Sequence, residues 1–193
     1  MTTVLDFPVA SGGAAVPAPL WCGLDYGPAV VVLSPSARRP TELPIAWQPL
    51  EQRFQIAWCA VPRDARSLHR VEDVLETLAD RNVRTHFVAH SALAEVACRM
   101  VAEFPGIARG LVLVGSGELP EPTGIPSRVL TIADSAGDET DLVHPYVVAE
   151  VSAALERVTT APAARVRLRL PDHDPVALGG VRRESSLIRR NAG

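Results

Sequence analysis

The sequence predicts a single α/β domain, spanning residues 1–193, with a mostly parallel sheet. Short aliphatic runs recur along the chain, and most of them are apolar throughout rather than alternating with polar residues. Runs of this kind are typical of strands that are covered on both faces. Segments with helical periodicity lie between the runs, so strand and helix alternate. This alternation predicts a doubly wound sheet with right-handed crossovers and helices on both faces.

The expected strands are the runs of β-type residues at 28–33, 54–61, 83–89, 110–114, 128–133 and 165–170. The last run differs because R-V-R-L-R-L alternates strictly and places three arginines on one face. Such alternation is typical of a strand near a sheet edge with one wetted face. Six glycines and prolines between Gly12 and Gly27 predict a loose hairpin or extended strands before the core sheet.

Helices are expected at 67–82, 92–104 and 146–158, where apolar residues recur on one helical face. The apolar stripe of the first helix consists of Val71, Val74, Leu75 and Leu78. Ser67 is its expected N-cap, and Asn82 is expected to stop it.

Composition excludes several classes of protein. The net charge is −3, and no apolar run is long enough for a membrane helix. The first ten residues carry Asp6 and no basic residue, unlike a signal peptide, so a cytoplasmic location is expected. Cys22, Cys59 and Cys98 are odd in number and far apart, which favours free thiols over disulfides or a metal site. Residues 165–193 hold seven arginines against three acids, but without aromatic interleaving they indicate a solvated face rather than nucleic-acid binding.

Polar residues follow the expected strands at their carboxyl ends, where ligands bind to open α/β sheets. In chain order these residues are Ser34 and Ser36, His90 and Ser91, Gly115 to Glu118, the acids Asp134, Asp138, Glu139 and Asp141, and Asp172-His173-Asp174. Serine, acid and histidine therefore occur on successive strand ends. A serine hydroxyl becomes a nucleophile when a histidine removes its proton, and an acid holds that histidine in the correct tautomer. The Ala92 N–H, at the start of the next helix, could stabilise developing negative charge.

The chain resembles the α/β-hydrolase family from about Leu24 to Asp174. L-D-Y-G-P-A-V-V-V-L-S-P-S resembles the third strand and oxyanion turn of that family. The stretch from V-E-D-V-L-E-T-L through F-V-A-H-S-A-L-A-E-V-A to G-L-V-L-V-G is similar to its helix, nucleophile elbow, elbow helix and sixth strand. Trp47 occupies a position where many members keep a tryptophan.

The resemblance implies a role for each candidate residue. Ser91 becomes the nucleophile, held on a strained strand-to-helix turn, and His173 becomes the general base. Spacing favours Asp138 as the acid, and Asp141 competes because D-L-V-H-P resembles the family's Asp-x-apolar-x-Pro. The backbone N–H groups of Ser36 and Ala92 would form the oxyanion hole. Of the three tryptophans, Trp47 is the one expected to contact a ligand.

The chain also departs from the family pattern. Ala89 and Leu93 stand where the elbow G-x-S-x-G has glycines, and Ser34-Pro35 replaces the His-Gly of the oxyanion turn. Only residues 116–127 link the strands that resemble the sixth and seventh strands of the family, so no cap domain is expected. A hydrolase without a lid suits small, exposed or flexible acyl groups.

These observations predict a serine hydrolase that cleaves an ester or thioester of a small-molecule acyl substrate. No cofactor, metal, nucleic acid or membrane is expected to take part, and a homodimer is compatible with the sequence. The alternative is a catalytically degenerate α/β-hydrolase-fold protein that serves as a binding or assembly module. A third reading keeps the fold for a non-hydrolytic reaction, such as cyclisation of an acyl chain, which would call for an aromatic-lined cavity.

Overall fold

The computed structural model describes residues 15–63, 65, 67–115, 128–133, 141–160 and 166–169. Its strands form a seven-stranded sheet in the order β1-β3-β2-β4-β5-β6-β7. The strands are β1 (Leu20–Gly23), β2 (Ala29–Ser34), β3 (Gln55–Ala60), β4 (Thr85–His90), β5 (Ala108–Val114), β6 (Arg128–Ala133) and β7 (Val166–Arg169). Only β1 runs antiparallel to its neighbour, β3, and the other described pairs are parallel. The mostly parallel sheet predicted from the aliphatic runs is therefore confirmed.

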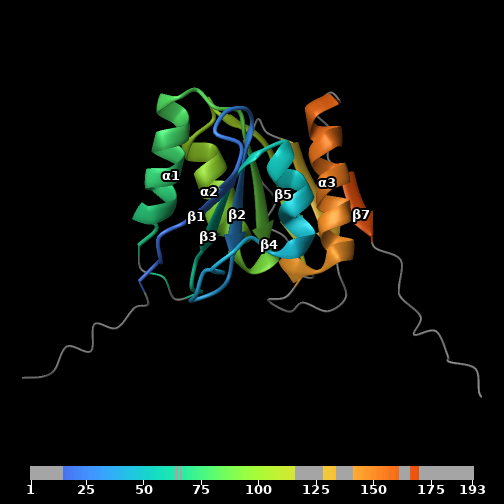
Figure 1. The fold of residues 1–193 in the computed structure, drawn as a ribbon, viewed down its shortest axis with the longest axis horizontal. Coiled ribbons are helices and arrows are strands. Elements are labelled where there is room, and N and C mark those ends of the chain that lie inside the picture. Colours follow the sequence, from blue (N-terminus) through green and yellow to red (C-terminus); the bar gives the residue numbers. More distant parts are fainter. Residues whose placement is uncertain are drawn as a thin grey trace, which may run out of the picture.

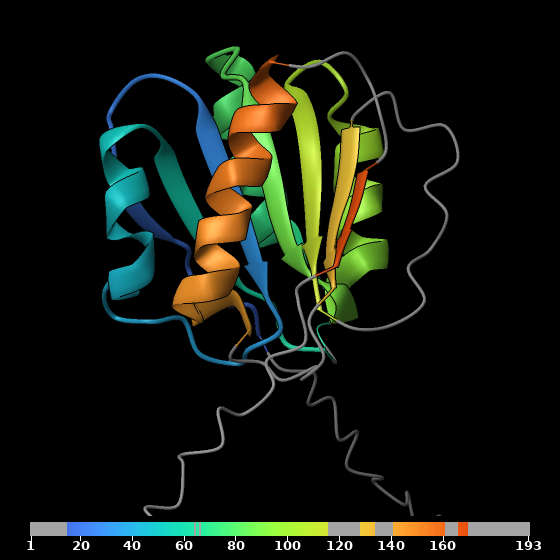
Figure 2. The same cartoon turned by 90° about the vertical axis from the view of Figure 1, so that its right-hand side faces the viewer.

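Helices cover both faces of the sheet, as predicted. The α-helices are α1 (His69–Asp80), α2 (Ala94–Glu103) and α3 (Pro145–Thr160), and the 3-10 helices are η1 (Ile45–Gln52), η2 (Ser91–Leu93) and η3 (Asp141–Val143). Figure 1 shows α1 and α3 at opposite sides of the molecule, and Figure 2 shows α3 in front of the sheet. Residues of α1 and α2 pack with one core cluster, and those of η1 and α3 pack with another.

The two core clusters follow from the alternation of side chains along each strand. In β2, Val31 and Leu33 pack towards α1 and α2, whereas Val30 and Val32 pack towards η1 and α3. Because β2 is fully buried, both sets must be apolar, which explains its continuous aliphatic run. No helix among the described residues is long and apolar enough to cross a bilayer.

Helix α1 begins one residue later than the sequence predicts. Leu68, not Ser67, is its N-cap residue, although the Ser67 hydroxyl accepts a hydrogen bond from the His69 N–H at 3.3 Å. The predicted stop is confirmed, because Asn82 adopts a positive φ of 50° directly after the helix. The N–H groups of Asn82 and Val83 then satisfy the last carbonyl oxygens of the helix.

Three further elements bear on the expectations from the sequence. The glycine- and proline-rich start of the chain contributes β1, which lies at one edge of the sheet. Helix η1 was not predicted, since Pro49 lies inside it and only Trp47 and Leu50 of its residues are buried. Strand β7 lies at the other edge, as the alternating arginines predicted.

Candidate functional site

The carboxyl ends of β2 and β4 form a topological switch point. These two strands are neighbours, with Ala29 opposite Thr85 and Leu33 opposite Ala89. The chain leaves β2 towards η1 on one face of the sheet and leaves β4 towards α2 on the other face. Diverging loops at such a point open a crevice, where ligands bind in open α/β sheets. Ser36 follows β2 and Ser91 follows β4, so both candidate residues lie at this end of the sheet.

The backbone at Ser91 is relaxed rather than strained. Ser91 begins η2, and the preceding His90 is extended, with φ −64° and ψ 142°. Asn82 is the only non-glycine residue of the described part that has a positive φ. The strained elbow that the resemblance implies is therefore not found at Ser91. The reason lies at Leu93, which is only 4% exposed and packs into the core with α1 and α2 residues, so a 3-10 turn replaces the sharp bend.

The two N–H groups expected to form an oxyanion hole already have acceptors within the chain. The Ala92 N–H donates to His90 Nδ1 at 3.1 Å. The Ser36 N–H donates to the Ser34 carbonyl oxygen at 2.8 Å, and the same oxygen accepts from the Val61 N–H. In this geometry neither amide is open, and each must exchange its acceptor before it can bind an oxyanion.

The Ser91 hydroxyl packs against Gly115, the residue that follows β5. Gly115 has a φ of 122°, and a Cβ built on it would collide with Ser91 Oγ. Because β4 and β5 are paired up to His90 and Val114, their following residues are held side by side. A glycine is therefore needed here both for its backbone conformation and for the room it gives to the serine.

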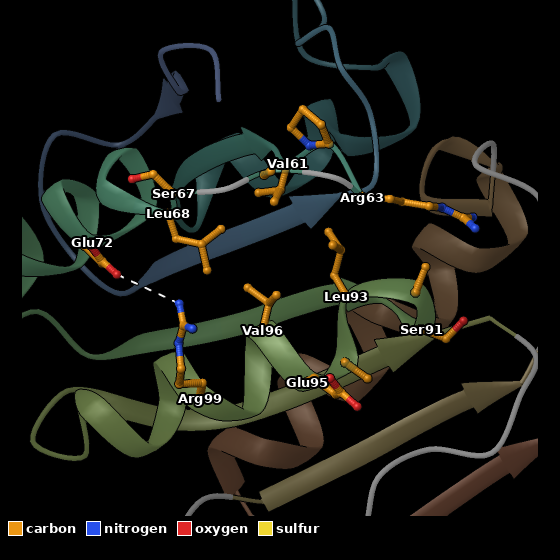
Figure 3. Close-up of a pocket in the computed structure, with 14 residues that line it drawn as sticks. Val61, Arg63, Ser67, Leu68, Glu72, Ser91, Leu93, Glu95, Val96 and Arg99 are labelled. Atoms are coloured by element: carbon orange, nitrogen blue, oxygen red, sulfur yellow. Dashed lines mark ion pairs between the residues drawn. The ribbon is translucent and has the colours of Figure 1, made fainter. Parts of the chain in front are cut away.

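A cavity of about 630 Å³ lies beside Ser91, between the end of β3 and the starts of α1 and α2. Figure 3 shows Ser91 at one end of this cavity, with its hydroxyl directed away from Leu93 and Val96. Val61 and Leu68 supply further apolar surface. A volume of this size is typical of small-molecule sites.

Charged side chains at the rim of this cavity escaped the sequence analysis. Arg99 lies 3.9 Å from Glu72, so an ion pair joins α2 to α1 across the cavity (Figure 3). A second ion pair, at 3.5 Å, links Arg99 to Glu103 on the same helix. The spacing of four residues between Arg99 and Glu103 was a readable signal for the second pair. The pair with Glu72 depends on tertiary packing and had no such signal.

The candidate acids and the candidate base are only partly described. Asp141 is the first residue of η3, which precedes α3. The neighbouring Leu142 is fully buried, and its carbonyl oxygen accepts a hydrogen bond from Trp47 Nε1 at 2.6 Å. Asp138 and His173 lie outside the described residues, so the triad of Ser91, His173 and an acid stays a prediction.

Trp47 is a core residue in the structure. Its side chain is fully buried, and its ring meets Trp58 edge to face with a centroid distance of 5.3 Å. It packs in the cluster formed with η1 and α3, on the opposite face of the sheet from Leu93. The expected ligand contact of Trp47 therefore has no support in the geometry.

The thiols are free, as predicted. Cys59 is buried, whereas Cys22 and Cys98 are half-buried. Burial raises the pKa of the Cys59 thiol to about 12, so this residue is a poor nucleophile. Within the described residues no group of three or more histidine, cysteine or carboxylate side chains could hold a metal ion.

No protein-family model matches the chain, and no curated protein matches it. Among solved structures, the chain is similar to a marine microorganism esterase, with a TM-score of 0.36 and 16% identity over 54% of this chain and 46% of that one. It is also similar to a membrane phospholipase A described as a bacterial virulence factor, with a TM-score of 0.43 and 14% identity over 78% and 74% of the two chains. A hydrolase from Pseudomonas aeruginosa PA01 gives a TM-score of 0.42 and 17% identity over 79% and 85%. The chain spans about half the length of the marine esterase, and likenesses this low carry no argument about the reaction.

Proposed function

We propose that the chain is a small serine hydrolase that cleaves an ester or thioester, with Ser91 as its nucleophile. One observation carries this proposal: Ser91 lies at the switch point of the sheet, at the start of η2, which leads into α2, and beside a cavity of about 630 Å³. The N-terminus of a helix carries partial positive charge, which favours the negative charge that develops in acyl transfer. Ser91 is half-buried, so a small substrate can approach it.

The pairing of the strands supports the resemblance to α/β-hydrolases. Strand β2 corresponds to the stretch that resembles the family's third strand, and it pairs with β4, the strand before Ser91. Strand β4 pairs in turn with β5, which corresponds to the family's sixth strand. In the proposal the fold is therefore α/β-hydrolase-like and has no cap domain.

The proposed reaction proceeds through an acyl-enzyme. Ser91 Oγ attacks the carbonyl carbon of the substrate and gives its proton to His173, which Asp138 or Asp141 orients. The Ala92 and Ser36 N–H groups exchange their present acceptors for the oxyanion. His173 then protonates the leaving alcohol or thiol as the bond to it breaks. A water molecule, deprotonated by His173, hydrolyses the acyl-enzyme and restores Ser91.

The cavity beside Ser91 supports a short acyl group as the substrate moiety. Its apolar surface comes from Leu68, Leu93 and Val96 among others, which suits an aliphatic chain. Because the Ser91 hydroxyl is directed away from Leu93 and Val96 (Figure 3), the proposal requires that it rotate towards this surface before it attacks. Arg63 and the ion pair between Arg99 and Glu72 border this surface, so a charged end of the substrate would meet opposite charge at the rim.

Labelling with a fluorophosphonate probe tests the proposal. The intact chain is expected to be labelled at Ser91, and Ser91→Ala should lose both the label and the hydrolysis of p-nitrophenyl acetate. Ser67→Ala is the matched control, because Ser67 lines the same cavity and its hydroxyl contacts His69 instead. A folded chain that never labels, or a Ser91→Ala variant with full activity, would contradict the proposal.

A binding or assembly module is the second candidate, and specific observations favour it. Both candidate oxyanion amides are hydrogen-bonded within the chain, and the turn at Ser91 is relaxed. In a protein that no longer hydrolyses a substrate, these amides could stay hydrogen-bonded, because no oxyanion would need them. Complete loss of a measurable esterase rate in Ser91→Ala would exclude this candidate, whereas equal background rates in the intact chain and Ser91→Ala would favour it.

A further inference from the structure

A second cavity, with a volume of about 720 Å³, lies at the amino edge of the sheet, at the opposite ends of the strands from Ser91. We call it the amino-edge cavity. It is built where the chain enters β2, β3 and β4, and includes Pro28, Gln55 and Val83. His86, near the start of β4, also lines it. At about 3.3 Å per residue, the length of β4 separates His86 from Ser91 by about 16 Å.

The walls of the amino-edge cavity are positively charged. Arg53, Arg81 and Arg84 line it, and no acidic side chain is among its described lining residues. Arg53 is neutralised from outside the cavity by Glu156 on α3, at 2.7 Å. The Arg84 guanidinium is exposed and has no hydrogen bond or ion pair with any residue in the described ranges. An unpaired guanidinium at the wall of a cavity offers a fork of donors to a carboxylate or a phosphate.

The floor of the amino-edge cavity is aromatic. Phe54 and His86 meet edge to face with ring centroids 6.2 Å apart, and the Arg53 guanidinium lies over the Phe54 ring at 5.6 Å. His86 is only 5% exposed, and its Nδ1 has no hydrogen-bond partner among the residues that the structure describes. Burial, assisted by the charge of Arg109, lowers the pKa of His86 to about 4, so the imidazole is neutral at neutral pH.

Hydrogen bonds hold the loop 24–27 in place over this floor. The Leu24 N–H donates to the Phe54 carbonyl oxygen at 3.1 Å. Gln55 Nε2 donates to the Gly27 carbonyl oxygen at 2.6 Å, and Arg81 Nη2 donates to the Asp25 carbonyl oxygen at 2.8 Å. The cavity is therefore formed before a ligand arrives, which lowers the entropic cost of binding.

We propose that the amino-edge cavity binds a small organic anion with a flat apolar body. The carboxylate or phosphate of the ligand contacts Arg84 and Arg81, and its flat body lies against Phe54 and His86. Tyr26, which lines the cavity and is 81% exposed, flanks the entrance. This site is separate from Ser91 and does not depend on the proposed hydrolysis.

Calorimetric titration of the full chain tests this proposal with phenyl phosphate, benzoate, inorganic phosphate and benzyl alcohol as probes. At least one of the two aromatic anions should bind, and benzyl alcohol should bind at least about tenfold more weakly, since it lacks the charge. The tighter of phenyl phosphate and benzoate identifies the anionic group. The flat-body part of the proposal is overturned if inorganic phosphate binds as tightly as phenyl phosphate, and the whole proposal if neither aromatic anion binds.

Arg84→Gln should weaken the aromatic anion by at least about tenfold, because it removes a charge-assisted contact and no described contact of the fold. Arg39→Gln is the matched control, since it removes the same charge from an exposed position after β2. Equal affinities for Arg84→Gln and the intact chain would overturn the proposal. Labelling of Ser91 should be unchanged in Arg84→Gln, so failure of this site and failure of the proposed hydrolase remain distinguishable.

Discussion

The Ala92 N–H donates a hydrogen bond to Nδ1 of His90, two residues earlier. The residue next to the candidate nucleophile thus occupies the amide that acyl transfer would use. If Ser91 is catalytic, this contact opposes turnover, because the amide must give up a hydrogen bond before it can hold an oxyanion. The hydrogen bond from Ala92 to His90 is therefore present in the resting site and must be broken in its reactive state.

Replacement of His90 should expose this competition. His90→Leu removes the acceptor and should raise the rate of p-nitrophenyl acetate hydrolysis about fivefold, since one net hydrogen bond contributes about 1 kcal/mol. His90→Gln keeps an acceptor in a side chain of similar length and should raise the rate less. Comparison of kcat/KM for each variant with that of the intact chain measures the effect. The unfolding free energies of the variants check that they fold. An unchanged rate in a stable His90→Leu variant would show that the Ala92 amide takes no part.

Gly115→Ala should destabilise the protein by about 2 kcal/mol and block labelling of Ser91. The alanine would have to adopt an unfavourable positive φ, and its Cβ would collide with Ser91 Oγ. Gly106→Ala is the matched control, because a Cβ there meets nothing within 4 Å, and its effect should be within about 0.5 kcal/mol. Urea unfolding measures both. In the Gly115→Ala background, Ser91→Gly should recover part of the loss, since it removes the collision and leaves the backbone strain.

Leu93→Ala should destabilise the protein by about 3 kcal/mol, as expected for a truncated core leucine. Leu93 is 4% exposed, and it packs against the cluster that includes α1 and α2. Alanine at this position is closer in size to the last glycine of G-x-S-x-G, so the motif alone would predict a more favourable nucleophile elbow. Ile45→Ala provides the control, because Ile45 is 82% exposed and should change stability little. A stable Leu93→Ala variant with higher activity would show that Leu93 obstructs the site rather than building it.

Much of the fold could be predicted from the sequence because its signals are local. The aliphatic run of β6 matched the structure at both ends, and the stop at Asn82 followed from the tolerance of asparagine for a positive φ. Element η1 was missed because its residues show neither a helical stripe nor alternation. It packs through Trp47 and Leu50, whose partners lie far away in the sequence.

The candidate site was less predictable for a physical reason. The order of residues placed Ser36 and Ser91 at the correct edge of the sheet, since topology determines which strand ends meet. The conformation of the turn depends instead on where Leu93 packs, and the state of the Ala92 amide depends on the rotamer of His90. Neither property is encoded in a local pattern, so a motif that locates the serine does not establish its geometry.

The buried imidazole of His86 should make stability depend on pH. Burial, with the Arg109 charge, lowers the pKa of His86 from 6.5 to about 4. Between these pH values the unfolded chain binds the proton and the folded chain does not, so stability is complete above about pH 6.5 and falls as the pH drops towards 4. The loss attributable to His86 is about 3 kcal/mol.

Urea unfolding between about pH 7 and about pH 4.5 measures this dependence. His86→Leu should flatten it, because the variant has no group to titrate at this position. His69→Gln is the control for the loss of an imidazole, since His69 lies at the exposed start of α1. A slope that persists in His86→Leu would assign the acid sensitivity to other groups.

The perpendicular Trp47 and Trp58 rings give the protein an optical label of its own. Two indoles held rigidly at this distance produce a chiral near-ultraviolet signal that vanishes when their neighbours loosen. Trp21, which is 42% exposed, contributes instead a red-shifted emission that solvent quenchers can reach. Spectroscopists can thereby follow tightening or melting beneath α3 without attaching a dye, and can separate it from events at the β1 edge.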